Sequence, residues 1–448
     1  MEHSEAHNII LTEGNILSGL ARFSAPILAG QLLQTLYNSV DSIVVGRCVG
    51  TSALAAVTAS MPIAQFFVGF FMGMSIGASV LLARSFGGKK FSELKRGIHT
   101  AVTFSLALGI AMIALGTAFT PMLLNAVSCP ADVYGEALIY LRIYMAGALC
   151  MTMYNMGSAV LLSVGDSRSP FIYLMASSFL NIVLYILFVA VFGMGVEGAA
   201  IATVIAQFIS VVLTFRMRMS ADARYRFSLW ETVIDGSLLK EIVGLGLPAG
   251  VHASVISLSV IFMQRCINSF SSAAIAWISA AMRIDSFAGM PCIAIGMAMT
   301  TYIGQNIGAK RYDRARGGSC ISLAAVAVMV TAVGIPAYFF AAPLLGIFSA
   351  DPDVVYYGTG MLHTLMPVYF FMGFNQMIGG VIRGYGYSMA AMLGTLSGIV
   401  AARQIWLAVM LHISHEIQWI YWCYPIGWVV AVLGMTIFYL QVIRRKYA

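Results

Sequence analysis

The chain has 448 residues, of which 60% are apolar or aromatic and only 10% are charged. Its mean hydropathy of +0.87 excludes a water-soluble globule, because a soluble domain usually carries about 25% charged residues. The polar remainder is too short for a second, soluble activity. It also lacks the G-x-x-x-x-G-K-[ST] pattern that holds ATP phosphates, which excludes an ATP-driven pump in one chain.

The apolar residues are grouped in stretches long enough to cross a bilayer as helices. In chain order, the first half has them at 16–45, 52–82, 98–121, 136–162, 169–192 and 196–216. The second half has them at 242–268, 273–304, 319–345, 355–382, 389–411 and 417–442. We therefore predict an all-α integral membrane protein with twelve transmembrane helices. Its predicted parts are an N-terminal lobe at 1–216, a cytoplasmic linker at 217–240 and a C-terminal lobe at 241–448.

The positive charges predict the orientation of the chain. Most of the 25 Lys and Arg residues lie near the two termini or in the loops that follow even-numbered spans, as at 84–96 and 310–316. The positive-inside rule then places both termini in the cytoplasm, as in a multi-pass protein of the cell (inner) membrane. The first fifteen residues lack the features of a cleaved signal. We interpret the net charge of +7 as a topology signal, and we expect no nucleic-acid partner.

The two halves of the sequence repeat each other. The stretch 77–90 resembles 298–311 at an offset of 221, and the same offset within one residue relates Pro26 to Pro248, Asp132 to Asp353 and Gly165 to Gly386. Six spans per repeat give both halves the same orientation. We therefore predict two six-helix lobes related by a pseudo-two-fold axis along the membrane normal, with substrate bound between them near the midplane.

A polar stripe follows one face of the first span, where four polar residues recur at spacings of three, four and three: Gln31, Gln34, Asn38 and Asp41. A charged group at a helix centre costs about 2.5–3.5 kcal/mol on insertion scales, so Asp41 needs a functional or structural reason. The equivalent positions of the second repeat are apolar: Ile256, Val260 and Met263. The stripe therefore indicates a site special to the first half. The alternative is that it only joins helices.

Two further polar pairs occur at i, i+4 spacing in the first half. Asn181 and Tyr185 lie on the fifth span, and Thr203 and Gln207 lie on the sixth. If these side chains face Asp41, they could hydrogen-bond its carboxyl group.

In the second half, Asp285 follows Arg283 closely, and either a structural ion pair or a coupling role would explain it. We expect Arg142 and Arg403 to act as counter-charges or carbonyl ligands within a lobe. The seven scattered cysteines are interpreted as free thiols. The pattern His412-x-x-His415-Glu416 has no second cluster, so we predict no metal site and no cofactor.

The sequence resembles the MATE (multidrug and toxic compound extrusion) family over essentially its whole length, and within it the DinF-type prokaryotic branch. The motifs that carry the resemblance are Leu36-Tyr37-Asn38-Ser-Val-Asp41, Gly87-Gly-Lys-Lys, Gly195-Val-Glu-Gly-Ala-Ala-Ile-Ala-Thr203 and Gly304-Gln-Asn-Ile-Gly308. The resemblance implies alternating access and antiport of amphiphilic cations or zwitterions against protons or sodium. It assigns coupling and pocket roles to Asp41, Gln34, Asn181 and Thr203. From the sequence pattern itself we add Tyr37, Asn38, Tyr185 and Gln207 as further candidate site residues.

One position departs from that family pattern. Many DinF-type relatives have a second acid one turn after the span-five asparagine, where this chain has Tyr185. A single protonatable acid, Asp41, therefore fits coupling to protons better than coupling to sodium. Sodium is kept as the alternative coupling ion. We hypothesise a monomeric, proton-coupled exporter of small cationic drugs or dyes that sits among membrane lipids.

Other functions remain as alternatives. A flippase of lipid-linked or amphipathic molecules would need several cations in its cavity, whereas the stripe is neutral apart from one acid. A major-facilitator transporter would need an acid in the loop after span two, which Arg84-Ser-Phe-Gly-Gly-Lys-Lys lacks. A membrane enzyme would need clustered His, Asp or Glu near one interface, and a receptor would need a signalling domain.

Overall fold

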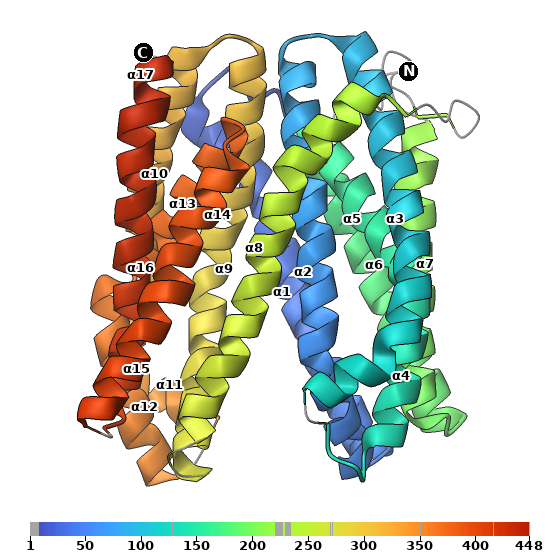
Figure 1. Ribbon diagram of the computed structural model, residues 1–448, viewed down its shortest axis with the longest axis vertical. Coiled ribbons are helices and arrows are strands. Elements are labelled where there is room, and N and C mark those ends of the chain that lie inside the picture. Colours follow the sequence, from blue (N-terminus) through green and yellow to red (C-terminus); the bar gives the residue numbers. More distant parts are fainter. Residues whose placement is uncertain are drawn as a thin grey trace. The chain divides into compact units, whose positions relative to one another are not determined.

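The computed structural model consists of helices joined by short turns and loops in the part of the chain that it describes (Figure 1). It describes residues 9–127, 129–219, 227–228, 234–268, 270, 272–348, 351–414 and 416–447. The side chains at 38, 40–48, 51, 54, 217–219, 261, 265, 268 and 272–275 lie outside the description. The predicted site residues Asn38 and Asp41 are therefore placed only as positions on a helix.

The helices of the first half are α1 (Ile16–Cys48), α2 (Thr51–Gly87), α3 (Phe91–Ala126), α4 (Tyr134–Ala146), α5 (Ala148–Ser163), α6 (Arg168–Tyr185), η2 (Ile186–Val191) and α7 (Gly195–Met219). The second half begins with α8 (Gly236–Asn268), α9 (Ser272–Gly308), α10 (Tyr312–Phe339), α11 (Ala341–Gly346), α12 (Pro352–Leu365) and η3 (Met366–Val368). It continues with α13 (Phe370–Gly384), α14 (Ser388–Leu396), η4 (Ser397–Ala402), α15 (Arg403–Ile413), α16 (Gln418–Phe438), η5 (Tyr439–Ile443) and α17 (Arg444–Lys446).

The prediction of an all-α membrane protein is confirmed. Within the described residues, ten helices are long and apolar enough to cross a membrane, or up to twelve if each of two bent helix pairs is one span. The bent pairs are 134–146 with 148–163, at 46°, and 352–368 with 370–384, at 51°. These are the predicted fourth and tenth spans. The first bend falls at Gly147, and the second follows a short 3₁₀ segment that contains Pro367, where a proline interrupts helical hydrogen bonding.

The backbone repeats itself at the offset that the sequence predicts. Both α2 and α9 have 37 residues, and their ends are 221 positions apart. The loops after them place Lys89 at φ 55° and Lys310 at φ 57°, the two non-glycine residues with positive φ in the described part of the chain. Gly165 and Gly386, again 221 apart, also have positive φ. A non-glycine residue rarely adopts this conformation, so the shared strain identifies the same loop built twice.

The chain is divided into two compact units that exchange the beginnings of their first helices. Unit 1 comprises Met1–Ile10 and Ala25–Ser254, and unit 2 comprises Leu11–Ser24 and Val255–Ala448. The first part of α1 thus belongs to unit 2, and the first part of α8 belongs to unit 1. The predicted lobe boundaries at 216 and 241 do not include this exchange, and they stay a prediction.

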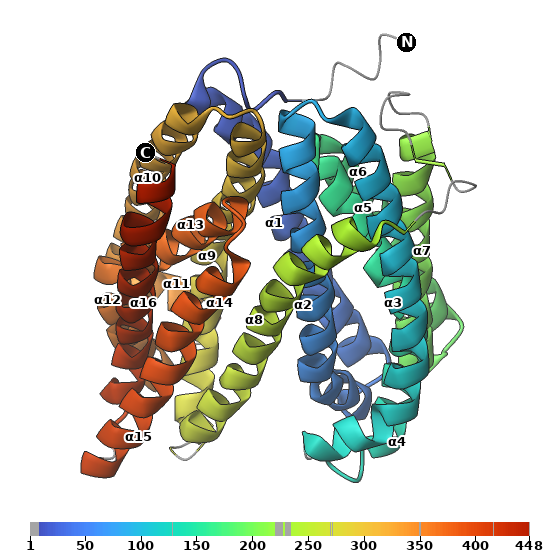
Figure 2. The ribbon, with the colours of Figure 1, turned by 45° about the horizontal axis from the view of Figure 1, so that its top comes forward.

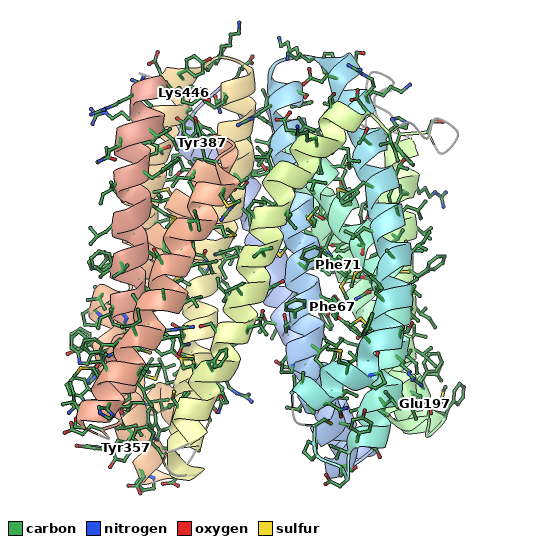
Figure 3. The ribbon with its side chains drawn as sticks, viewed as in Figure 1. Phe67, Phe71, Glu197, Tyr357, Tyr387 and Lys446 are labelled. Atoms are coloured by element: carbon green, nitrogen blue, oxygen red, sulfur yellow. The ribbon has the colours of Figure 1, made fainter. Side chains whose placement is uncertain are left out.

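In unit 1, α2 packs against α3, α4 and α5, and α7 packs against α4, α5 and α6. Unit 2 has the same scheme, in which α9 packs against α10, α12 and α13 (Figure 2). The apolar core of unit 1 includes Phe67 and Phe71 of α2, which Figure 3 labels.

Glycines allow two helices of unit 1 to approach closely. A Cβ added at Gly73 or Gly77 of α2 would overlap the backbone of α8 at Gly250 or Gly246. Small residues at such crossings are typical of membrane helices, whose association depends on close backbone packing.

Candidate functional site

Two of the predicted polar positions meet inside unit 1. Asn181 of α6 donates from Nδ2 to Thr203 Oγ1 of α7 at 3.5 Å, and Thr203 Oγ1 in turn donates to the Ala199 carbonyl at 3.1 Å. Asn181 is 2% exposed, and its Oδ1 is buried without a hydrogen-bond partner among the described residues. A buried amide oxygen in this state is able to accept a hydrogen bond from a further donor.

Tyr185 lies one turn beyond Asn181 and is also 2% exposed. It belongs to an apolar cluster that includes Tyr140, Val57 and Val189, and Tyr140 stacks on Tyr144 with ring centroids 6.2 Å apart. The aromatic pair on α4 was missed from the sequence, although its i, i+4 spacing was available as a signal. The residues after Tyr185 form the π-helical segment η2, a feature often found at functional sites.

The helix that carries the polar stripe passes both α6 and α7. A Cβ added at Gly30 of α1 would lie 3.6 Å from a methyl group of Leu174 on α6, and one added at Gly195, the first residue of α7, would lie 3.8 Å from Val49. Asp41 is a helical position between these two contacts. Gln34, Tyr37 and Gln207 are half-buried, and the structure does not describe how their side chains meet Asp41.

Asp285 and Arg283 do not form the ion pair that was one of the two explanations considered for Asp285. Arg283 is exposed, and its guanidinium lies 6.0 Å from the centre of the Phe348 ring. Asp285 accepts a hydrogen bond from the Tyr369 hydroxyl at its main-chain carbonyl, at 2.9 Å. Its Oδ1 is buried without a hydrogen-bond partner, and no ion pair joins the two residues in the described part of unit 2. Two helical positions only two residues apart do not face each other.

Arg403 is held inside unit 2 by neutral groups. Its Nη2 donates to Ser259 Oγ at 2.6 Å, and its guanidinium lies 5.8 Å from the centre of the Tyr424 ring. The sequence predicted a counter-charge or a carbonyl ligand, and the partner is instead a hydroxyl group.

In the described residues, no group of three or more His, Cys, Asp or Glu residues is arranged to hold a metal ion. His415 of the second-half triplet lies outside the description.

Comparisons with known proteins agree with this architecture. The model of the MatE family matches residues 26–187 and 248–404. The chain is 27% identical over 446 residues to "Probable multidrug resistance protein YoeA" of Bacillus subtilis, covering 96% of this chain and 95% of that protein. It is 28% identical over 379 residues to "Probable multidrug resistance protein YpnP" of the same species, covering 84% of each.

Among solved structures, a MOP superfamily transporter from Pyrococcus furiosus superposes with a TM-score of 0.90 at 22% identity, covering 98% of each chain. At that identity the likeness establishes the fold.

Proposed function

The chain belongs to the MatE family, a family of multi-pass membrane transporters, and from this membership we propose that it is a secondary multidrug efflux transporter. In the proposed mechanism it exports cationic or zwitterionic amphiphiles in exchange for protons, by alternating access. Its relatives named as probable multidrug resistance proteins support the export of drug-like compounds.

The observation that carries the proposal is the polar contact inside unit 1. Asn181 and Thr203 meet between α6 and α7, and α1, the helix that carries Asp41, lies against α6 at Gly30. The buried, unpartnered Asn181 Oδ1 is suited to accept a hydrogen bond from a protonated carboxyl group or from a substrate N–H group.

The coupling follows from the chemistry of one carboxyl group. When ionised, Asp41 attracts a drug cation; when protonated, it no longer does, so the cation is released. Occupancy by a proton and by a cation is close to mutually exclusive, which links export to the proton gradient. Each elementary charge that crosses 100 mV of potential supplies about 2.3 kcal/mol.

A proton fits this site better than sodium does. A sodium ion requires several oxygen ligands, and Tyr185 occupies the position where many DinF-type relatives have a second acid. The tyrosine is packed in an apolar cluster, where its hydroxyl group does not supply the missing negative charge.

The substitution Asp41→Asn tests this role in cells that accumulate a cationic dye. We expect it to abolish efflux with unchanged expression and an unchanged size-exclusion profile, because an amide does not take up the proton. Glu197→Gln, at an exposed acid in the first turn of α7, is the control, and we expect it to keep most of the efflux. Efflux by the Asp41 variant at the wild-type rate would refute the proposal.

A further inference from the structure

A cavity of about 670 Å³ lies in unit 2, where the loop between α9 and α10 meets the beginning of α1. Its lining includes Ile16, four basic residues and one acid: Lys310, Arg311, Arg314, Arg316 and Asp313. The topology rule explains why this loop is basic. The rule does not explain why the basic side chains line the same cavity.

The arginines of this cavity are held by neutral main-chain oxygens. Two of them reach the segment before α1: Arg311 Nη1 donates to the Thr12 carbonyl at 2.9 Å, and Arg314 Nη2 donates to the Glu13 carbonyl at 2.6 Å. Arg316 donates to the carbonyl of Tyr447 near the C-terminus. Carbonyl groups fix the guanidinium positions but leave their charge uncompensated.

The charge is also not cancelled by ion pairs. Across the described residues of unit 2, none of the four basic side chains forms a salt bridge. Arg316 Nε is buried without a hydrogen-bond partner. A buried guanidinium N–H without an acceptor is costly, so the cavity favours an anionic ligand.

The repeat supplies an internal comparison, because unit 1 builds the same loop with ion pairs around it. Three basic side chains there pair with acids of their own unit: Lys90 with Glu93 at 3.2 Å, Arg96 with Asp235 at 3.0 Å and Arg84 with Glu241 at 3.6 Å. Glu93 occupies the register of Arg314 at the offset of 221. Among the described residues, ion pairs of the basic side chains near this loop are therefore found in unit 1 and not in unit 2.

We propose that this cavity binds the headgroup phosphate of an anionic phospholipid. Two apolar spans, α9 and α10, end at Gly308 and begin at Tyr312, which places the loop at headgroup depth. On the predicted topology this is the cytoplasmic leaflet, whose anionic lipids attract basic residues. The planar guanidinium group of an arginine can donate two parallel hydrogen bonds to two oxygens of a phosphate group. A bound lipid would hold the beginning of α1 on unit 2, whether or not the efflux proposal is correct.

Thermal unfolding of the purified full-length chain in detergent tests the lipid site. The added probes are phosphatidylglycerol, phosphatidylethanolamine and inorganic phosphate, each alone. A ligand that binds the folded state raises the melting temperature. We expect phosphatidylglycerol to raise it by several degrees, and the other two probes to change it by much less.

The variants localise the effect. Lys310→Gln with Arg311→Gln should lose at least half of the phosphatidylglycerol shift. Lys89→Gln with Lys90→Gln, at the same register of unit 1, should keep the full shift. Asp313→Asn, which removes the acid of the cavity, should enlarge it, and this outcome stays measurable if the first variant does not fold. Equal shifts in both double variants with no gain in Asp313→Asn, or a full shift with inorganic phosphate or phosphatidylethanolamine, would overturn the proposal.

Discussion

Asn181 shows how a single residue of the site depends on its helix neighbours. Its amide is buried, bonds Thr203 through nitrogen and leaves the oxygen available. The spacing of polar residues predicted that α6 and α7 each present a polar pair, and the structure brings one member of each pair together. Whether Tyr185 and Gln207 also face Asp41 stays a prediction.

The substitution Thr203→Val tests the importance of that contact. Valine keeps the shape of threonine but does not accept a hydrogen bond from the Asn181 N–H group. A hydrogen bond of this kind typically contributes about 0.5–1.5 kcal/mol. We therefore expect the KM for efflux of a cationic dye to rise several-fold with little change in the maximal rate. Thr117→Val on α3, where the hydroxyl group bonds only main-chain carbonyls of its own helix, is the control and should transport normally. A normal KM in the Thr203 variant would contradict the assigned role.

Asp235 caps the beginning of α8 outside the membrane-spanning part. Its carboxylate accepts from Ser237 Oγ at 2.6 Å and from two main-chain amides. The Ser237 hydrogen bond, together with the amides and Arg96, lowers the pKa of this carboxyl group below its usual value.

A lowered pKa in the folded state means that this carboxylate stabilises the protein above its unfolded pKa. That contribution is lost as the pH falls through the lower, folded value. We expect Asp235→Asn to lower the melting temperature at neutral pH, and the difference from wild type to shrink as the pH falls below about 4. Thermal unfolding of both proteins in detergent, from neutral to acidic pH, measures this difference in melting temperature. A difference that stays constant over that range would exclude an electrostatic contribution.

At the scale of helices, the sequence predicted the membrane spans well but did not predict the bends and π-helical segments within them. Apolar length and the positive loops predicted the helices, because both properties are local. The bends near Gly147 and Pro367 lie inside apolar runs that read as single spans. The π-helical segments η2 and η4 lie inside similar runs, because a π-turn depends on the packing around it. Arg403 follows η4 directly and bonds Ser259, a partner far away in the sequence.

The crossing of α2 and α8 gives a direct prediction about helix packing. Gly77→Ala places a methyl group against the backbone of Gly246, and overpacking of this kind typically costs about 1–3 kcal/mol. Gly244→Ala adds the same methyl group to α8 where nothing lies within 4 Å, so it should be neutral or slightly stabilising. We expect a lower melting temperature for the first variant only. Equal melting temperatures of the two variants would show that α2 and α8 can move apart at this crossing without loss of stability.

At the scale of the whole molecule, comparing the two repeats separates the features that both halves share from those that occur in one half only. The two halves share helix order, loop strain and packing scheme. They differ in the polar stripe of α1 and in the basic cavity after α9. The offset of 221 was visible in the sequence. The exchange of helix beginnings at Ser24 and Ser254 was not, because the apolar pattern of α1 is continuous across Ser24.

The central claim is that one acid in the first half couples export to protons. Proteoliposomes with an imposed pH gradient test it most directly, by recording proton release after a cationic dye is added. The account predicts that the dye dissipates the pH gradient with the wild-type chain and not with Asp41→Asn, and that an imposed sodium gradient is unaffected. Dissipation of the sodium gradient alone, or equal proton release by both proteins, would contradict it.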